Sequence, residues 1–193
     1  PGVIDNYTID GRLVAMPQFV DAGVMFYRKD LLDKYNLPVP FTWNRLIECA
    51  NKIVAAERAT GNQDIWGLLF HGMPYEGLTC CALEWLYAHG AGTIVDEGGS
   101  VTINNPAAVE TLSMVSEWIG TLSPEQVLEF NEEASRRMFK DGKAVFLRNW
   151  PYVWPYFQTD ASRIKDKVGV IPVPKGPPNG PFPSVMGGWG LAV

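Results

Sequence analysis

The sequence has little positive charge, and its basic residues are scattered. Among its 193 residues, 16 Lys and Arg side chains are outnumbered by 21 Asp and Glu side chains, which gives a formal net charge of −5. A protein that binds nucleic acid needs clustered Lys and Arg to replace counterions along the phosphate backbone. The charge pattern therefore argues against a nucleic-acid partner.

Long hydrophobic runs are also missing. The compact apolar stretches, such as residues 23–27 and 66–70, are much shorter than the roughly 20 residues of a membrane-spanning helix. With 47% hydrophobic and 19% charged residues, the composition is that of a globular domain. The last residues, 189–193, have the pattern of a buried strand with no turn after it. From this pattern we expect a fragment of a longer protein.

Cysteine and histidine are scarce. Cys80 and Cys81 are adjacent, where a disulfide would need a strained backbone, and no C-x-x-C pair occurs. His71 and His89 lie far apart in the sequence and lack the spacing of structural zinc ligands. We therefore expect buried free thiols, including Cys49, and neither a metal ion nor a cofactor.

Motifs of common enzymes are absent as well. The sequence contains no G-x-S-x-G elbow, H-E-x-x-H zinc motif, phosphate-binding loop or dinucleotide fingerprint. A glycoside hydrolase, however, needs only two carboxylates about 5–10 Å apart. Glu76 and Glu84 lie close enough in the sequence to share one face of a helix, so a hydrolase using paired carboxylates is the alternative hypothesis. Their simpler interpretation is an acid that stabilises a helix N-terminus and an acid that faces solvent.

Strand and helix patterns alternate along the chain. Nearly continuous apolar runs predict buried strands at residues 23–27, 66–70, 143–147 and 168–172. Apolar residues spaced three and four apart predict helices between residues 42–61, 77–89, 106–119 and 132–140. Glycine pairs or Asp-Gly turns predict hairpins within residues 7–16 and 93–103. The alternation favours an α/β fold with helices on both faces of a buried sheet.

Helix boundaries are marked by capping residues. Thr42, Asn105 and Asn131 can each accept a hydrogen bond from a free amide in a first helical turn. Pro106 suits the first helical position, and Gly90 suits the left-handed conformation that ends a helix. These residues predict where the helices begin and end.

Aromatic residues gather beside glycine and proline at the junctions between predicted elements. They form clusters at residues 72–77, 148–152 and 187–190. In open α/β folds such junctions line the ligand crevice. A flat ring can desolvate the C–H face of a sugar while polar side chains bond its hydroxyl groups. We expect Trp150 and Trp189 in such a cleft.

Two other tryptophans have a simpler explanation. Trp85 and Trp118 occur at positions where helical spacing already accounts for them. An apolar residue in the stripe of an amphipathic helix faces the core. We therefore predict that both are core residues and not ligand contacts.

Five segments carry a family resemblance as a set. They are residues 21–32, 40–43, 75–80, 148–152 and 187–193. Together they resemble the extracellular solute-binding proteins of sugar ABC transporters, and within that family the trehalose/maltose-type binding proteins. The likeness runs from about Tyr7 to Val193 in the family's order.

The resemblance implies a periplasmic-binding-protein-like fold of type 2, in which two lobes hold the ligand between them. It assigns residues 1–23 to the end of the first lobe and residues 24–29 to a hinge crossing strand. Residues 30–183 would be the second lobe, and residues 184–193 the return crossing strand. The chain would then be an incomplete two-lobed protein made mainly of the second lobe.

The resemblance also implies a set of ligand-binding residues. They are Asp21, Tyr75, Trp150, Tyr152, Gly188 and Trp189. Asp21 would accept hydrogen bonds from sugar hydroxyl groups, the two tryptophans would stack on sugar rings, and the remaining three would complete this side of the cleft. The sequence departs from the family pattern at Phe19, where relatives often carry Tyr, and at Cys81, where a polar residue is more usual.

The implied function is capture of a disaccharide or small oligosaccharide and its delivery to ABC transporter permease subunits in the membrane, without enzymatic activity. The implied location is the periplasm or the cell exterior, which includes a membrane-anchored lipoprotein. Two other hypotheses stay open. One is the glycoside hydrolase lobe, and the other is a structural module that self-associates through exposed aromatic side chains.

Overall fold

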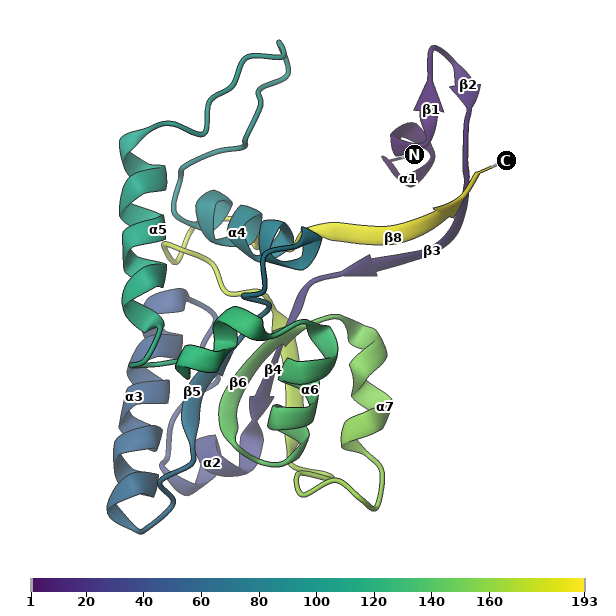
Figure 1. Ribbon diagram of the computed structural model, residues 1–193. Helices are drawn as coiled ribbons and strands as arrows, with labels where there is room; N and C mark the ends of the chain where they lie inside the picture. The colour runs from purple at the N-terminus through teal and green to yellow at the C-terminus, as the bar shows by residue number, and fades with distance from the viewer. Residues whose placement is uncertain (1, 193) are drawn as a thin grey trace.

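A four-stranded mixed sheet lies at the centre of the computed structural model, which describes residues 2–192 (Figure 1). Its order is β5-β6-β4-β7, with β4 at Val24–Arg28, β5 at Trp66–Leu69, β6 at Ala144–Asn149 and β7 at Val168–Pro172. β5 and β6 are parallel, whereas β4 runs antiparallel to β6 and β7. The four predicted strands are thus confirmed, and β6 continues past the predicted end to Asn149, which pairs with Val24.

Helices cover both faces of this sheet, as the alternating pattern predicts. They are α2 (Lys29–Lys34), α3 (Trp43–Ala59), α4 (Glu76–Ala88), α5 (Pro106–Trp118), α6 (Glu132–Lys140) and α7 (Trp154–Phe157), with short 3-10 segments at Glu125–Glu129 and Pro151–Val153. Figure 1 shows α3 and α5 on one side of the sheet and α6 and α7 on the other. The fold is therefore a layered α/β structure.

Adjacent residues of β4 supply the two separate cores. Met25 packs with residues of α3, α4 and α5, whereas Phe26 packs with Phe139 of α6 and Phe157 of α7. Successive strand residues point to opposite faces, so one strand serves both cores. The first core also contains Trp85 and Trp118, which are 2% and 5% exposed. Both tryptophans are core residues, as predicted.

The predicted helix caps are confirmed. Asn105 and Asn131 each accept a hydrogen bond at 3.0 Å, from the amides of Ala108 and Ala134. Gly90, just after α4, has a φ of +79°. Side-chain oxygens thus satisfy amides that the first turns of α5 and α6 leave free.

One predicted hairpin forms only in part. Within residues 93–103, pairing is limited to an isolated antiparallel bridge between Val95 and Val101. These two side chains are 46% and 73% exposed. Backbone hydrogen bonds from Asp96 to Ser100 and from Thr102 to Ile94 flank the bridge. Residues 93–102 are exposed, so little packed apolar surface supports longer strands there.

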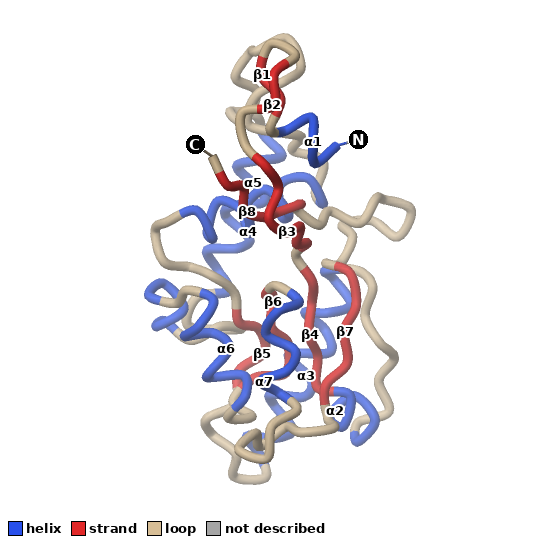
Figure 2. Tube along the Cα trace, turned by 90° about the vertical axis from the view of Figure 1, so that its right-hand side faces the viewer, coloured by secondary structure: helices blue, strands red, loops and turns tan. Residues whose placement is uncertain are grey.

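A two-stranded antiparallel ribbon extends from the sheet. It consists of β3 (Met16–Ala22) and β8 (Met186–Leu191), in which Phe19 pairs with Trp189. At its far end stand α1 (Gly2–Asn6) and the hairpin of β1 (Thr8–Ile9) and β2 (Arg12–Leu13), as Figure 2 shows from the side. This hairpin confirms the predicted turn, since Asp10 and Gly11 both have positive φ, at 50° and 74°.

The strands of the ribbon and the sheet can be compared with the predicted lobe boundaries. Residues 24–28, within the segment expected to cross between lobes, form the β4 strand of the sheet. β3, from the segment expected to end the first lobe, is the strand that pairs with β8. The boundaries 1–23, 24–29, 30–183 and 184–193 stay predictions.

Candidate ligand-binding cleft

A cleft of about 1010 Å³ lies where the ribbon meets the edge of the sheet. All six predicted ligand-binding residues line it, namely Asp21, Tyr75, Trp150, Tyr152, Gly188 and Trp189. The other lining residues include Phe19, Glu76 and Glu132. The structure thus brings the predicted residues together from four separate parts of the chain, while their contacts with a ligand stay a prediction.

Strand directions explain why these residues meet. β5 and β6 are parallel, so the residues that follow them emerge at the same edge of the sheet. β4 is antiparallel to β6, and its first residue, Val24, pairs with Asn149 at the end of β6. Tyr75 follows β5, Trp150 follows β6 and Asp21 precedes β4. Such an edge is where α/β folds place their ligands.

The two cleft tryptophans differ in their surroundings. Trp150 is 9% exposed, whereas Trp189 is 70% exposed on the ribbon. The guanidinium carbon of Arg148 lies 4.2 Å from the centre of the Trp150 ring, and a Cβ at Gly187 would come within 3.1 Å of that ring. Trp150 is therefore a fixed wall of the cleft, while Trp189 has a free aromatic surface.

A buried ion pair lies behind Trp150. The Arg148 guanidinium donates to both carboxylate oxygens of Glu84, at 2.8 and 2.7 Å, and the two side chains are 1% and 0% exposed. Glu84 Oε1 also accepts from the backbone amide of Val185 at 3.1 Å. The expectation that Glu84 faces solvent is therefore wrong, because a cation distant in the sequence gives this carboxylate a buried partner.

The paired-carboxylate arrangement is not formed by Glu76 and Glu84. Glu76 lies in the first turn of α4, is exposed and lines the cleft, as the helix-terminus interpretation expects. It accepts a hydrogen bond from the Cys80 thiol at 2.8 Å. Glu84 is sequestered by Arg148 and is not among the lining residues. These two acids therefore do not flank a common bond in the cleft.

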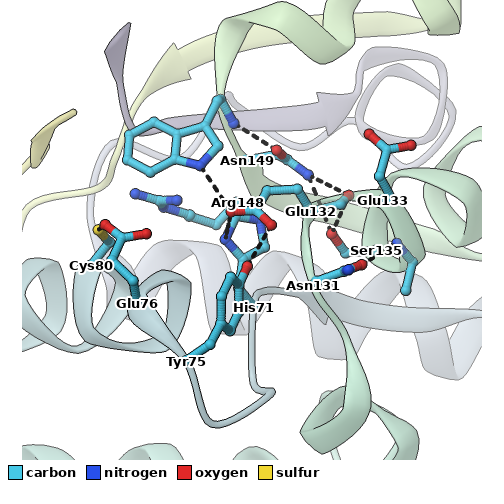
Figure 3. Close-up of polar contacts among 12 residues, drawn as sticks. His71, Tyr75, Glu76, Cys80, Asn131, Glu132, Glu133, Ser135, Arg148 and Asn149 are labelled. Atoms are coloured by element: carbon cyan, nitrogen blue, oxygen red, sulfur yellow. Dashed lines mark hydrogen bonds and ion pairs between the residues drawn. The ribbon is translucent and has the colours of Figure 1, made fainter. Parts of the chain in front are cut away.

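Glu132, the first residue of α6, is a cleft residue that sequence reasoning missed (Figure 3). The Tyr75 hydroxyl donates to Oε2 at 2.5 Å and the Trp150 indole donates to Oε1 at 3.4 Å. Partial burial raises the pKa of this carboxyl, but the Tyr75 hydrogen bond and its own backbone amide outweigh that effect and lower the pKa below its ordinary value. The sequence signal for this residue was an acid next to the Asn131 cap. Stabilisation of the helix N-terminus already explains an acid at that position, so nothing in the sequence assigned it to the cleft.

His71 lies beside Glu132 without any hydrogen bond from its ring. Its side chain is fully buried, and neither ring nitrogen has a hydrogen-bond partner among the described residues. His71 Nδ1 lies 3.8 Å from Glu132 Oε1. Burial, and then the charge of Arg148, lowers the pKa of His71 to about 3. The imidazole is therefore neutral at physiological pH.

Asp21 and Tyr152 complete the polar groups of the cleft. Partial burial raises the pKa of Asp21 even though its Oδ1 accepts from the Ala22 amide at 3.0 Å. The Tyr152 hydroxyl donates to Glu133 Oε1 at 2.9 Å. Both side chains thus hold fixed positions and keep further hydrogen-bonding capacity for a ligand.

The cysteines are buried and free, as predicted. Cys49, Cys80 and Cys81 carry no disulfide. Burial raises the pKa of Cys80 to about 12 and that of Cys81 to about 11, so both stay as thiols. Among residues 2–192, no group of three or more His, Cys, Asp or Glu side chains is arranged to hold a metal ion.

The chain matches a known family along its length. The model of the bacterial extracellular solute-binding proteins matches residues 1–193. A probable ABC transporter-binding protein from Deinococcus radiodurans is 47% identical over 195 residues, which cover 100% of this chain and 46% of that protein. Maltodextrin-binding protein MdxE of Bacillus subtilis is 26% identical over 192 residues, which cover 97% of this chain and 43% of MdxE.

Solved structures give the same result for the fold. Maltose-bound T. maritima MalE3 has a TM-score of 0.90 and 45% identity, with 100% of this chain and 48% of that chain covered. A solute-binding protein from Agrobacterium radiobacter in complex with ribitol has a TM-score of 0.87 and 26% identity, with 100% and 47% covered. The predicted type 2 periplasmic-binding-protein-like fold is confirmed.

The chain spans about half the length of the relatives it matches. Within residues 2–192, none of the helices has both the length and the apolar character needed to cross a bilayer. The family model, the relatives and the fold agree with the motifs found in the sequence. The chain belongs to the bacterial extracellular solute-binding protein family.

Proposed function

We propose that this chain forms one side of the sugar-binding cleft in the substrate-binding component of an ABC transporter. The observation that carries the proposal is the convergence of two tryptophans, two tyrosines and an aspartate on one cleft. Aromatic faces desolvate the apolar side of a sugar ring, and carboxylates accept from its hydroxyl groups. The family membership and the maltose bound to T. maritima MalE3 support the same function.

Each predicted residue has a role in this proposal. Trp150 and Trp189 stack on sugar rings, the first as a fixed wall and the second from the ribbon. Asp21 accepts from sugar hydroxyl groups, Tyr75 supplies an aromatic ring, and Tyr152 supplies an aromatic edge and a hydroxyl. Gly188, at a φ of +146°, allows β8 to pass close to β3, where a Cβ would lie 2.4 Å from the Phe19 carbonyl oxygen. Its backbone lines the cleft and would face the ligand.

The ligand we propose is a disaccharide or small oligosaccharide. A cleft of about 1010 Å³ has room for more than one sugar ring. MdxE is named for maltodextrin, MalE3 holds maltose, and the GacH receptor of Streptomyces glaucescens, 28% identical to this chain, binds acarbose. These ligands support an oligosaccharide class, with maltose and trehalose as first candidates.

We further propose that capture depends on closure of two lobes. Residues 1–23 would end the first lobe, residues 24–29 and 184–193 would cross between lobes, and residues 30–183 would form the second lobe. Closure is driven by the ligand's higher affinity for the closed form, and the closed protein would deliver the sugar to permease subunits at the membrane. The protein would act in the periplasm or outside the cell.

Calorimetric titration tests this function. The 193-residue chain alone and the full-length gene product that contains it are titrated with maltose and trehalose. We expect saturable binding by the full-length product and much weaker binding by the chain alone, because closure requires contacts from both lobes. Absence of binding to either sugar and to maltotriose by the full-length product would overturn the proposal, and release of glucose would indicate a glycosidase instead.

A further inference from the structure

Glu132 stands where three cleft segments meet. It is the first residue of α6, Tyr75 precedes α4, and Trp150 follows β6. Its carboxylate accepts from the Tyr75 hydroxyl through one oxygen and from the Trp150 indole through the other. One side chain thus bridges two rings that come from different segments of the cleft. Figure 3 shows its contacts with Tyr75 and His71.

This carboxylate has no cationic partner among residues 2–192. The adjacent Glu133 pairs with Arg136 in the usual i,i+3 manner. The basic group within 4 Å of the Glu132 carboxylate is the neutral His71, at 3.8 Å. Neutral donors and the N-terminus of α6 therefore stabilise the negative charge. Hydrogen bonds to a charged acceptor are stronger than neutral ones. The carboxylate therefore holds the Tyr75 hydroxyl firmly at 2.5 Å, and it holds the Trp150 indole more weakly at 3.4 Å.

The backbone of Glu132 is tied to Trp150 as well. The Asn149 side chain donates to the Glu132 carbonyl at 3.0 Å, and its Oδ1 accepts from the Trp150 amide at 2.7 Å. Asn149 is fully buried and also donates to Ser135 Oγ at 3.2 Å. Both the main chain and the indole of Trp150 are therefore fixed relative to the first turn of α6.

We propose that Glu132 is a positioning residue, which sets the rings of Tyr75 and Trp150 at a fixed mutual orientation for the ligand. This inference rests on the proposed sugar-binding function. Immobilising rotatable side chains before binding removes an entropic cost from the binding step. The Tyr75 hydroxyl acts in this arrangement through Glu132 and not through a sugar hydroxyl.

A double-mutant cycle on the full-length gene product tests the proposal. The variants are E132A, Y75F and the E132A/Y75F pair, titrated with maltose by calorimetry. We expect E132A to weaken binding about tenfold and Y75F to weaken it less. In the E132A background we expect Y75F to have no further effect, because the hydroxyl then has no carboxylate to bond. E132Q, which keeps one acceptor oxygen, should lie between wild type and E132A.

The controls separate positioning from folding. E129Q removes one negative charge at an exposed glutamate outside the cleft and should leave the Kd within twofold. The melting temperature of E132Q should stay near that of wild type, while its Kd for maltose rises. If E132A fails to fold, the double-mutant cycle is run with E132Q and Y75F. Additive losses in the cycle would overturn positioning and assign Glu132 a direct sugar contact. Failure of the wild-type protein to bind maltose, trehalose or maltotriose would overturn the proposed function and, with it, this inference.

Discussion

At the scale of single residues, the two cleft tryptophans differ in how much of their side-chain surface is buried on folding. Trp150 is nearly buried and packs on Arg148 and Gly187, so its ring contributes to stability as well as to the cleft. Trp189 keeps 70% of its surface exposed. A side chain that folding leaves exposed can lose its ring with little effect on folding, which makes Trp189 the cleaner probe of binding.

We predict that Trp189→Ala weakens maltose binding by the full-length gene product by about 1–3 kcal/mol, because truncation of a stacked ring removes apolar contact area from the interface. The free energy of unfolding should change by less than about 0.5 kcal/mol, as for most surface substitutions. Calorimetry on the full-length gene product measures the affinity for maltose, and urea unfolding measures the free energy of unfolding. Tyr87→Ala, at an aromatic residue 48% exposed but outside the cleft, is the control, and equal losses of affinity in both variants would contradict the prediction.

His71 should make the stability depend on pH. Burial, and then the Arg148 charge, lowers its pKa from 6.5 to about 3. Between these values the unfolded chain binds a proton that the folded chain does not, so stability falls as pH decreases below 6.5. For a single group the slope approaches 1.4 kcal/mol per pH unit.

Urea unfolding at several values between pH 7 and pH 5 measures this slope, in a range above that where most carboxylates titrate. His71→Leu should have a smaller slope than wild type, whatever its absolute stability. Parallel curves for the two proteins would show that His71 does not carry the effect.

At the scale of elements, the junction between the ribbon and the sheet leaves no room for a side chain. Gly23 lies between β3 and β4, and a Cβ there would stand 2.0 Å from Glu84 Oε1 and 2.5 Å from Arg148 Nη2. The Gly23 amide also donates to the Val185 carbonyl at 3.1 Å, next to the start of β8. Both strands of the ribbon are thus anchored beside the same buried ion pair.

We predict that Gly23→Ala destabilises the protein by about 1–3 kcal/mol, because the added methyl group must displace Glu84 or Arg148. Thermal or urea unfolding measures the loss. Gly98→Ala adds the same atom in an exposed loop, where the nearest atom is the Asp96 side chain at 3.3 Å, and should change stability by less than about 0.5 kcal/mol. A Gly23→Ala protein as stable as the Gly98→Ala control would refute this account of the junction.

At the scale of the whole molecule, the Glu84–Arg148 pair connects α4, β6 and the ribbon. Glu84 also bonds Val185, and Arg148 packs on Trp150 of the cleft. An ion pair buried this completely depends on each partner, because either charge alone would remain desolvated. The pair therefore joins the cleft wall to both strands of the ribbon.

We predict that Glu84→Gln costs about 3–5 kcal/mol of stability, since it leaves the Arg148 charge buried without its counter-charge. A Glu84→Leu/Arg148→Met double variant should recover much of that loss, because no buried charge remains. Unfolding curves of the three proteins test the pair. A double variant no more stable than Glu84→Gln would contradict the electrostatic explanation.

Local sequence patterns predicted most elements and the aromatic clusters at their ends. The four strands and the main helices followed from apolar periodicity, and Asn105 and Asn131 marked helix starts because a cap bonds an amide only three residues away. The aromatic clusters were found because glycine and proline place them at element ends. Each of these features depends on neighbours within a few positions, so the sequence by itself determined them.

Tertiary structure alone decided the features that depend on distant partners. Glu84 is buried because Arg148, far along the chain, neutralises it, and Glu132 is a cleft residue because Tyr75 and Trp150 converge on it. Residues 93–103 pair only at the Val95–Val101 bridge, because residues 93–102 remain exposed and little tertiary packing supports them. Burial and hydrogen bonding between distant residues are set by how the layers pack, and periodicity in a single segment carries no information about that packing.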